Sequence, residues 1–233
     1  MNKKLSIIIP CFNEENSIEQ IVEKVIEVAS SPYEIIIIDD FSTDKTRFIL
    51  ENNLKSKVDK LILNPSNLGK GYSLRQGIKE ASGDIILIQD ADLEYDPNDY
   101  KKLIEPIISG YADVVYGSRF AGSEKKRALF FWHMIGNKIL TILSNMCTNL
   151  NLTDMEVGYK VFKSDVLKGI KLNEDRFGFE PEITAKIAKK KLRIYEVGIT
   201  YHGRKYSEGK KITWRDGFSA IRCIILYNLI KKL

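Results

Sequence analysis

Short, wholly apolar segments that each run into a cluster of polar residues most strongly constrain the fold of this chain. Such segments lie at 5–9 (LSIII), 34–40 (EIIIIDD), 60–64 (KLILN), 84–90 (DIILIQD) and 112–118 (ADVVYGS). Between them lie stretches with apolar residues at helical spacing. Apolar strands that alternate with helices are typical of a parallel sheet buried on both faces. The sequence therefore predicts an α/β fold with a mostly parallel sheet flanked by helices.

The helical stretches continue into the second half of the chain, where the order of elements changes. In the first half they span 18–29, 42–54, 69–81 and 98–108. The second half predicts a long amphipathic helix at 126–150, a strand at 156–163, a helix at 181–191, a strand at 192–201 and a closing amphipathic helix at 214–233. No internal repeat or Gly/Ser linker separates the two halves. We therefore expect a single domain over residues 1–233, with amphipathic helices toward its C-terminus.

The formal net charge of +5 hides a division along the chain. Residues 1–117 carry 13 Lys and Arg against 20 Asp and Glu, whereas residues 118–233 carry 23 against 11. A basic second half suggests a partner with phosphate groups, an anionic lipid surface or a nucleic acid. A solvated, lysine-rich surface is the alternative interpretation.

Neither hydropathy nor the cysteines indicate a membrane span or a disulfide framework. No apolar run reaches 18 residues and no signal-type cleavage site follows the N-terminus, so we expect a cytoplasmic protein, soluble or peripheral to the membrane. Cys11, Cys147 and Cys223 are odd in number and widely spaced, which predicts neither a disulfide network nor a zinc site. His133 and His202 have no metal-ligand spacing.

Polar residues follow each apolar strand of the first half. The segments are PCFNEEN, DDFSTD, NPSNLGKG, QDADLEYD and GSRF. In a parallel sheet these strand ends meet at one edge, where α/β proteins bind ligands. Asp39 and Asp40 could there accept hydrogen bonds from a base or a ribose. The chain contains neither a GxGxxG motif nor a P-loop, which argues against dinucleotide and P-loop chemistry.

An acidic cluster with an Asp-x-Asp pattern follows the fourth apolar segment: Asp90, Asp92 and Glu94. In an extended segment, side chains two residues apart point the same way, so the three carboxylates would face one ligand. Oxygen ligands on one side suit Mg²⁺ or Mn²⁺, which would also stabilise a departing diphosphate. The alternative is a solvated turn in which Asp96 and Pro97 open the next helix.

Six blocks of the sequence follow one another in an order that resembles a known family. They are SIIIPCFNEENSI, EIIIIDDFSTDKT, NLGKGYSLRQGIKEASGDIILIQDADLEYDP, VVYGSRF, TDMEVGYKVFK and HGRKYSEGKK, and they cover about residues 5–212. The chain resembles a family 2 glycosyltransferase of the Rossmann-like GT-A fold. Within that family it is similar to the dolichol-phosphate mannosyltransferase-like group, which uses polyprenyl phosphates.

The resemblance implies roles for individual residues. Those implied for nucleotide binding are Pro10, Phe12, Asn13, Glu14, Asp39, Asp40, Lys70, Asp90 and Ala91. Of these, Asp40 is the expected contact with the base. The implied metal ligands are Asp90, Asp92 and Glu94, for Mg²⁺ or Mn²⁺. Many relatives carry Gln where this chain has Glu94, whose added negative charge favours tighter metal binding.

The residues implied for catalysis are Asp92, Arg119, Arg204 and Glu180. Arg119 and Arg204 match positions that contact phosphates of the donor or the acceptor. Near Arg204 this chain reads SEGKK where many relatives read GxSK, which leaves the roles of Lys210 and Lys211 open.

The implied reaction is inverting, metal-dependent transfer of a sugar from GDP-mannose or a UDP-sugar to a polyprenyl or dolichyl phosphate. An ionised phosphate nucleophile needs no strong general base, whereas a hydroxyl acceptor does. In the second case Glu180 and Asp154 are the candidate bases, with orienting or capping roles as the alternative. Two other functions stay open: transfer to a sugar hydroxyl in glycan, capsule or lipopolysaccharide synthesis, and non-catalytic binding of a nucleotide sugar or nucleic acid.

The two halves of the chain then have different expected tasks. Residues 1–120 would bind the nucleotide sugar and the metal, and the basic residues 121–233 would face the acceptor and the membrane. Lys125, Lys126 and Arg127 precede the apolar stripe of the long helix, which could lie at a bilayer surface. Alternatively, this stripe packs on the sheet or on a second copy in a homodimer, and a separate membrane protein is a further conceivable partner.

Overall fold

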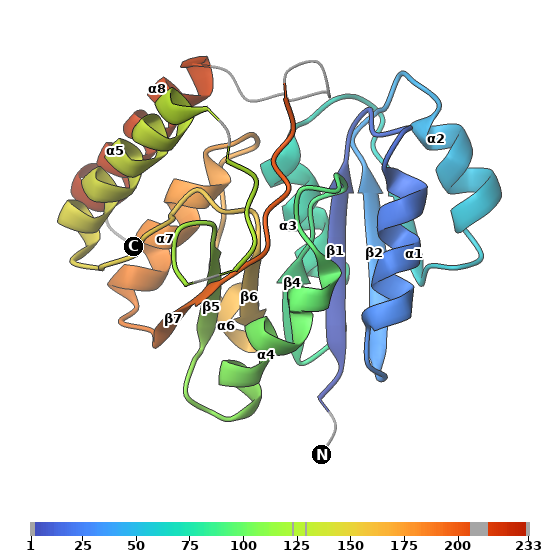
Figure 1. Cartoon of the computed structure of the whole chain (residues 1–233), viewed down its shortest axis with the longest axis horizontal. Helices are drawn as coiled ribbons and strands as arrows, with labels where there is room; N and C mark the ends of the chain where they lie inside the picture. The colour runs from blue at the N-terminus through green and yellow to red at the C-terminus, as the bar shows by residue number, and fades with distance from the viewer. Residues whose placement is uncertain (1–2, 123, 129, 206–213, 232–233) are drawn as a thin grey trace.

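The computed structural model describes residues 3–122, 124–128, 130–205 and 214–231, and these residues form a seven-stranded sheet with helices on both faces (Figure 1). The order of the strands is β3-β2-β1-β4-β6-β5-β7. Their bounds are β1 (Leu5–Cys11), β2 (Tyr33–Asp39), β3 (Lys60–Leu63), β4 (Ile85–Ile88), β5 (Val114–Ser118), β6 (Lys160–Lys163) and β7 (Ile194–Gly198). The α/β class predicted from the apolar segments is therefore confirmed.

All neighbouring strands are parallel except at β6, which runs antiparallel to both β4 and β5. Ile88, the last residue of β4, pairs with Lys160, the first residue of β6. The start of β6 therefore lies at the same edge of the sheet as the ends of the parallel strands. This reversal brings the segment before Lys160 to the edge where ligands bind in such folds.

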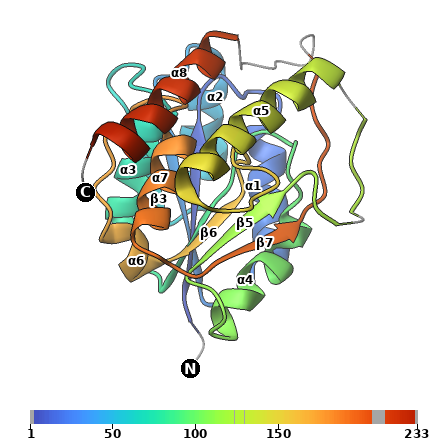
Figure 2. The same cartoon turned by 90° about the vertical axis from the view of Figure 1, so that its left-hand side faces the viewer.

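Helices cover both faces of the sheet. Their bounds are α1 (Ile18–Val28), α2 (Thr46–Ile49), α3 (Lys70–Glu80), α4 (Tyr100–Ile108), α5 (Phe131–Thr148), α6 (Ser164–Lys168), α7 (Phe179–Lys189) and α8 (Trp214–Ile225). Shorter helical turns are η1 (Leu50–Leu54), η2 (Pro97–Asp99) and η4 (Leu226–Ile230). Figure 2 shows α3, α6 and α7 on one side of the sheet and α1 and α4 on the other. Strands β1 and β2 are buried along nearly their whole length, which is why they lack polar alternation.

Two differences from the sequence-based prediction affect the functional edge. The predicted strand 84–90 ends at Ile88, and the predicted strand 156–163 begins only at Lys160. The residues between the predicted and observed bounds at this edge, 89–90 and 156–159, lie outside the regular strands. Helix α6 was not predicted, because five residues are too few to show helical periodicity.

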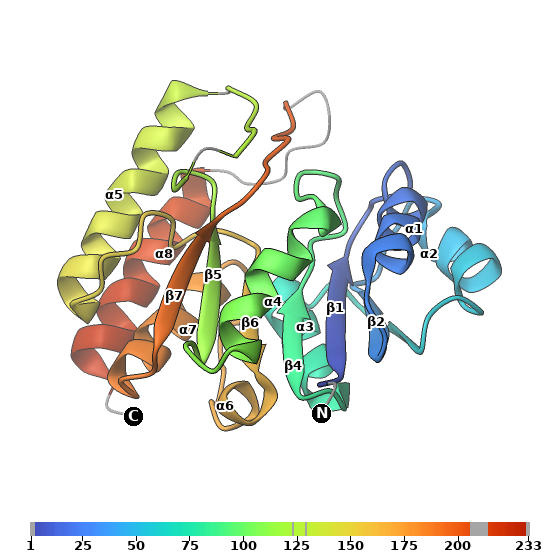
Figure 3. The same ribbon diagram turned by 60° about the horizontal axis from the view of Figure 1, so that its bottom comes forward.

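Helices α5, α7 and α8 pack against one another at one end of the molecule, while α1 and α2 lie at the other end (Figure 3). Helices α5 and α8, with the turn η4, leave large apolar side chains exposed. These are Phe131, Trp132, Ile139, Ile142, Met146, Phe218, Ile225, Leu229 and Ile230. Within the described residues, no helix combines the length and apolar composition needed to cross a bilayer.

Candidate functional site

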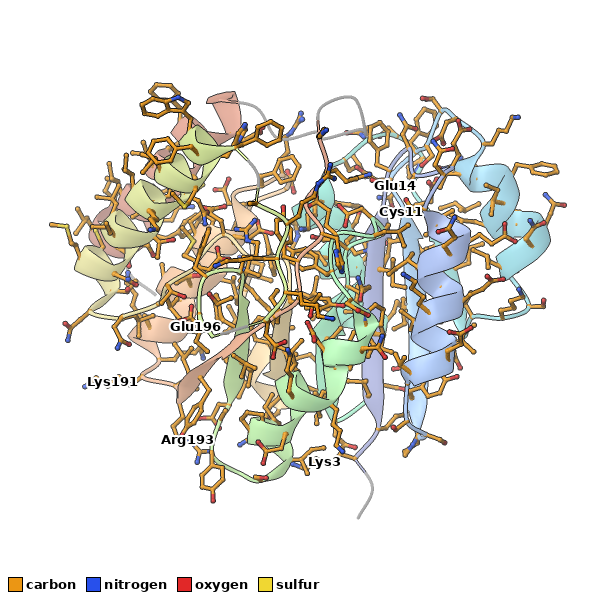
Figure 4. All side chains as sticks on the ribbon, in the orientation of Figure 1. Lys3, Cys11, Glu14, Lys191, Arg193 and Glu196 are labelled. Atoms are coloured by element: carbon orange, nitrogen blue, oxygen red, sulfur yellow. The ribbon has the colours of Figure 1, made fainter. Side chains whose placement is uncertain are left out.

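The polar segments that follow the strands meet at one edge of the sheet, as the sequence predicts. Figure 4 labels Cys11 and Glu14 at this edge, while Arg193 lies at the opposite edge, before β7. We call the first edge the carboxyl edge. Pro10 and Cys11 are the last residues of β1 and pair with Ile38 and Asp39 of β2. The loops after β1 and β2 therefore start side by side.

The loops after β1 and β2 are joined by hydrogen bonds. Asn13, in a left-handed conformation with φ 51°, donates its backbone N–H to Ser42 Oγ at 2.9 Å and accepts from Thr43 N at 2.8 Å. The backbone N–H of Glu14 donates to Thr46 Oγ1 at 2.7 Å. The predicted nucleotide residues Pro10 to Glu14 thus form one rigid border of the carboxyl edge.

Asp39 is the last residue of β2 and Asp40 follows it, but both carboxylates are buried and bonded to the protein itself. Asp39 Oδ2 accepts from Arg47 Nε at 2.9 Å and from Arg47 Nη2 at 2.7 Å. Asp40 accepts from the backbone N–H groups of Leu68 at 2.9 Å and Gly69 at 2.7 Å. As the side chains stand, Asp40 fixes the loop before α3, and its contact with a base stays a prediction.

That loop places Lys70 in the site. Gly69 has φ +101°, and a Cβ at this position would collide with the carbonyl oxygen of Asp175. Glycine is therefore required for both the backbone conformation and the close approach. Lys70 begins α3, and its Nζ lies 2.8 Å from Asp90 Oδ1 and 3.2 Å from Glu180 Oε1. Burial alone would lower the pKa of Lys70, but Asp90 and Glu180 outweigh it and raise that pKa.

The acidic cluster after β4 bends away from the extended path that the sequence suggested. Residues 91–94 form a bend, in which Glu94 N donates to Asp92 Oδ1 at 3.1 Å. The alternation argument is therefore wrong for this segment, because alternation holds only in extended backbone. Asp90 instead pairs with Lys70, and Ala91 is buried between the two acidic residues.

Asp92 and Glu94 share one cation, Arg204, which the segment after β7 brings to the carboxyl edge. Arg204 Nη2 lies 2.9 Å from Asp92 Oδ2, and its backbone N–H donates to Glu94 Oε1 at 2.7 Å. Arg204 Nη1 also donates to Glu14 Oε2 at 3.0 Å. Burial and the charges of Asp90 and Glu94 nevertheless raise the pKa of Asp92 to about 8. Arg204 therefore does not fully offset the burial of Asp92 and its crowding by other acidic groups.

This donor set fits a hard divalent cation, although the side chains are not gathered around one point. No group of three or more His, Cys, Asp or Glu side chains in the described parts of the chain is arranged to hold a metal ion. Asp90 pairs with Lys70, whereas Asp92 and Glu94 pair with Arg204. Carboxylate oxygens are the ligands that Mg²⁺ and Mn²⁺ prefer, so these three residues would hold such an ion.

Arg119 leaves β5 and pairs with Asp154. Its Nε and Nη2 each lie 2.7 Å from a different oxygen of that carboxylate, and Asn137 Nδ2 of α5 adds a bond at 2.9 Å. Burial would raise the pKa of Asp154, but Arg119 outweighs it and lowers that pKa. A fully buried carboxylate held ionised by hydrogen bonds from Arg119 and Asn137 positions Arg119 and is poorly suited to accept a proton.

Two residues that the sequence reasoning missed lie beside this site, Glu156 and Lys160. Lys160 is fully buried, donates to the carbonyl oxygen of Val157 and lies with Nζ 4.9 Å from the centre of the Tyr116 ring. Burial and the charge of Glu180 raise the pKa of Glu156 to about 8. Burial lowers the pKa of Lys160 to about 8. Their block, TDMEVGYK, was visible, but only the reversal of β6 places it at the carboxyl edge.

The structure thus brings Glu14, Lys70, Asp90, Asp92, Glu94, Arg119, Glu180 and Arg204 to the carboxyl edge. Phe12 follows β1 at this edge and is partly exposed. Lys210 and Lys211 lie outside the described residues.

The fold and this edge define a class: the seven-stranded sheet is that of the GT-A glycosyltransferases. A crystal structure of glucosyl-3-phosphoglycerate synthase from Mycobacterium tuberculosis, in complex with Mn²⁺, UDP and glucosyl-3-phosphoglycerate, superposes with a TM-score of 0.77 at 18% identity. The match covers 99% of this chain and 82% of that one. The model of glycosyl transferase family 2 matches residues 6–170, and the chain belongs to this family.

Similar proteins include enzymes named for lipid-phosphate acceptors. The chain is 30% identical over 232 residues to the dolichol-phosphate mannosyltransferase of Pyrococcus furiosus, covering 98% of this chain and 64% of the relative. It is 30% identical over 226 residues to the low-salt glycan biosynthesis hexosyltransferase of Haloferax volcanii, covering 95% and 53%. For the dodecaprenyl-phosphate galacturonate synthase of Rhizobium johnstonii the identity is 28%, covering 89% and 61%. The chain spans between about half and two thirds of the length of these relatives.

Proposed function

We propose that this protein transfers a sugar from a nucleotide-diphosphate sugar to a polyprenyl phosphate. The observation that carries the proposal is the meeting of Asp90, Asp92 and Glu94 with Lys70 and Arg204 at the carboxyl edge. Anionic and cationic groups in one site suit a reaction that moves negative charge onto a leaving diphosphate. Relatives named for dolichol-phosphate and dodecaprenyl-phosphate support this acceptor class.

In this proposal Asp90, Asp92 and Glu94 hold Mg²⁺ or Mn²⁺ together with the donor. When bound, the cation would supply positive charge that stabilises a leaving diphosphate. Arg204 now balances Asp92 and Glu94, and its guanidinium is close enough to turn toward a phosphate instead. The nucleoside lies along the border formed by residues 12–14, near the end of β2.

The acceptor side of the proposal centres on Arg119. A phosphate oxygen of the lipid forms the new bond to the anomeric carbon while the bond to the diphosphate oxygen breaks, which inverts the configuration. Because the phosphate is already ionised at neutral pH, no group has to remove a proton. Arg119, fixed by Asp154, offers its remaining N–H groups and its charge to that phosphate.

The exposed apolar side chains of α5, α8 and η4 would bring the protein to the lipid. Trp132 and Leu229 are 78% and 70% exposed, and Arg222 of α8 has a side chain that is 61% exposed. Helices that combine apolar and basic side chains bind at bilayer interfaces. In this arrangement residues 1–120 supply most of the nucleotide and metal site, and residues 121–233 carry the helices that face the membrane, while both halves contribute side chains to the reaction centre.

The test is a transfer assay with purified protein, Mn²⁺ and a set of UDP- and GDP-sugars. Two acceptors are compared: a short-chain polyprenyl phosphate in detergent and free or lipid-linked saccharides. We expect a glycosyl phosphate lipid, detected by mass spectrometry, with inverted anomeric configuration by NMR and no product when EDTA is present. Transfer only to a saccharide hydroxyl would contradict the proposed acceptor, and retention of configuration would contradict the mechanism.

A further inference from the structure

Two glutamates beside the site each have a buried carboxylate oxygen without a hydrogen-bond donor among the residues that the structure describes. The atoms are Glu156 Oε1 and Glu180 Oε2. A buried oxygen of a carboxylate that lacks a donor is costly, and native proteins rarely retain one without a reason. Glu180 is 4% exposed as a residue, so bulk water does not readily supply the donor.

Both glutamates are next to the residues proposed to hold the donor. Lys70 Nζ forms ion pairs with both Glu180 and Asp90, so a single ammonium group lies between Glu180 and the acidic cluster. Glu156 precedes Gly158, and a Cβ at Gly158 would collide with Asp90 Oδ2. The turn that carries Glu156 is therefore in direct contact with Asp90. The charge of Glu180 also raises the pKa of Glu156, which agrees with their closeness.

A neighbouring glutamate shows what a purely structural role looks like in the same helix. Glu182 of α7 is fully buried, and its carboxylate accepts from the backbone N–H groups of Asn173 at 2.9 Å and Glu174 at 2.8 Å. Lys186 adds an ion pair at 2.5 Å. Both oxygens of Glu182 are thus used inside the protein. Glu180, two residues earlier, uses only Oε1.

We propose that Glu156 and Glu180 bind hydroxyl groups of the donor sugar and so select a neutral hexose over a uronic acid. The inference rests on the proposed function and names its substrate class. The carboxylate of Glu180, paired with Lys70, accepts hydrogen bonds, and Glu156, with its raised pKa, can donate one as well as accept one. Sugar hydroxyls donate and accept hydrogen bonds, so they can bind to both glutamates. A sugar that carries its own carboxylate would instead bring like charges together in a site of low dielectric.

The two nearby lysines do not reverse this preference. Lys70 is already engaged by Asp90 and Glu180, and Lys160 is engaged by the carbonyl oxygen of Val157 and the ring of Tyr116. The charge of Lys70 is thus balanced by two carboxylates, and the ammonium group of Lys160 is held by a carbonyl oxygen and an aromatic ring. A uronic acid would have to displace one of these contacts before it gained a cation.

The test compares sugars that differ only at C6. Isothermal titration calorimetry with Mn²⁺ measures the affinity of the full chain for UDP, UDP-glucose and UDP-glucuronic acid, and for GDP, GDP-mannose and GDP-mannuronic acid. We expect the neutral sugar nucleotide to bind about tenfold more tightly than its uronic acid, for whichever base is accepted. Equal or tighter binding of the uronic acid overturns the inference. If no nucleotide binds at all, the proposed function itself fails.

Variants then assign the discrimination to the two residues. In Glu156→Gln and Glu180→Gln we expect the ratio of the affinities for the neutral sugar nucleotide and its uronic acid to fall to below about threefold, whatever the affinity for the nucleoside diphosphate alone. Glu196→Gln is the matched control, because Glu196 is also partly buried but bonds to Thr153 N, and its preference should equal that of the wild type. An unchanged ratio in both variants overturns the assignment. If a variant does not fold, the wild-type affinities for the neutral sugar nucleotide and its uronic acid still decide whether the preference exists.

Discussion

Arg119 and Asp154 form a bidentate ion pair in which Nε–Oδ2 and Nη2–Oδ1 are both 2.7 Å. The carboxylate is completely buried, whereas the arginine side chain is 16% exposed toward the carboxyl edge. The pair joins the end of β5 to the turn that leads into β6. A cation is thereby held at the site by an anion that solvent does not reach.

The first prediction concerns the stability that this pair provides. We expect Asp154→Asn to lower the free energy of unfolding by about 3 kcal/mol, because Arg119 would keep its charge in a mostly buried place without a counter-charge. Urea denaturation at pH 7 measures the difference. The control is Glu23→Gln, which removes an exposed pair with Lys57 and should cost less than about 0.5 kcal/mol. Similar losses in both variants would mean that the buried Asp154–Arg119 pair stabilises the fold no more than an exposed surface pair does.

The second prediction tests the turn that places Lys70. Gly69→Ala adds a Cβ that collides with Asp175 in a backbone conformation that L-residues rarely adopt, and we expect a loss of more than about 2 kcal/mol. Gly110→Ala is the matched control, because Gly110 also has positive φ, +79°, but no atom lies within 4 Å of its Cβ position. We expect it to lose about 1 kcal/mol. Thermal and urea unfolding of both variants separate the collision from the backbone strain.

The sequence predicted those parts of the site that depend on local pattern. Apolar segments followed by acidic residues located β2 and β4 and placed Asp40 and Asp90 at one edge, as the structure confirms. It could not predict that Asp40 bonds to Leu68 and Gly69, because that contact spans almost 30 residues. The direction of each side chain is set by such long-range partners.

Glu156 and Lys160 show a second limit of the sequence reasoning. Their place at the carboxyl edge follows from the antiparallel direction of β6, and a four-residue strand gives no local signal of its direction. A parallel β6 would have put Lys160 at the opposite edge. Strand order and direction are properties of the whole sheet, which a pattern within one segment does not contain.

The third prediction is a pH dependence that arises far from the site. Glu34 of β2 accepts from Ser82 N at 2.6 Å and pairs with Lys4 at 3.0 Å. Burial raises its pKa, but hydrogen bonds from Ser6, Ser82 and Lys4 outweigh burial and lower the pKa from 4.5 to about 2. The pKa of Glu34 is lower in the folded protein than in the unfolded chain. Its ionised carboxylate therefore contributes its full share of the folding stability above about pH 4.5, and this share is lost as the pH falls toward 2.

We therefore expect Glu34→Gln to be less stable than the wild type by about 3 kcal/mol at pH 7, and this gap to shrink below pH 4.5. Urea denaturation at several pH values between 7 and 3 gives the gap directly. Glu27→Gln, at an exposed position of α1, is the control and should differ little from the wild type at any pH. If the difference in free energy of unfolding between the wild type and Glu34→Gln stayed constant with pH, the lowered pKa of Glu34 would not be the source of its stabilisation.

The fourth prediction concerns the acidic cluster. Asp92→Asn replaces one carboxyl group of a crowded cluster with an amide of similar shape, so we expect the fold to be kept and sugar transfer to fall by about 100-fold or more. Initial rates over a range of Mn²⁺ concentrations, together with the melting temperature, measure both effects. Asp96→Asn is the control, because Asp96 caps η2 through Asn98 N and takes no part in the cluster. Unchanged transfer in Asp92→Asn would exclude a role in metal or donor binding.

The last prediction concerns the exposed apolar end of the molecule. Trp132 and Leu229 lie on α5 and η4, at the end opposite α2 (Figure 3), and we expect them to enter the interface of a bilayer. Flotation with vesicles containing anionic lipid should show binding that weakens with salt, since basic side chains accompany these residues. Trp132→Glu and Leu229→Glu should each reduce binding by about fivefold or more, because a carboxylate is costly in the interface and is repelled by anionic headgroups. Phe48→Glu, at a 64% exposed position of α2, should leave binding unchanged. Equal losses in all three variants would mean that the contact is non-specific, and no binding by the wild type would remove the membrane-facing assignment of this end.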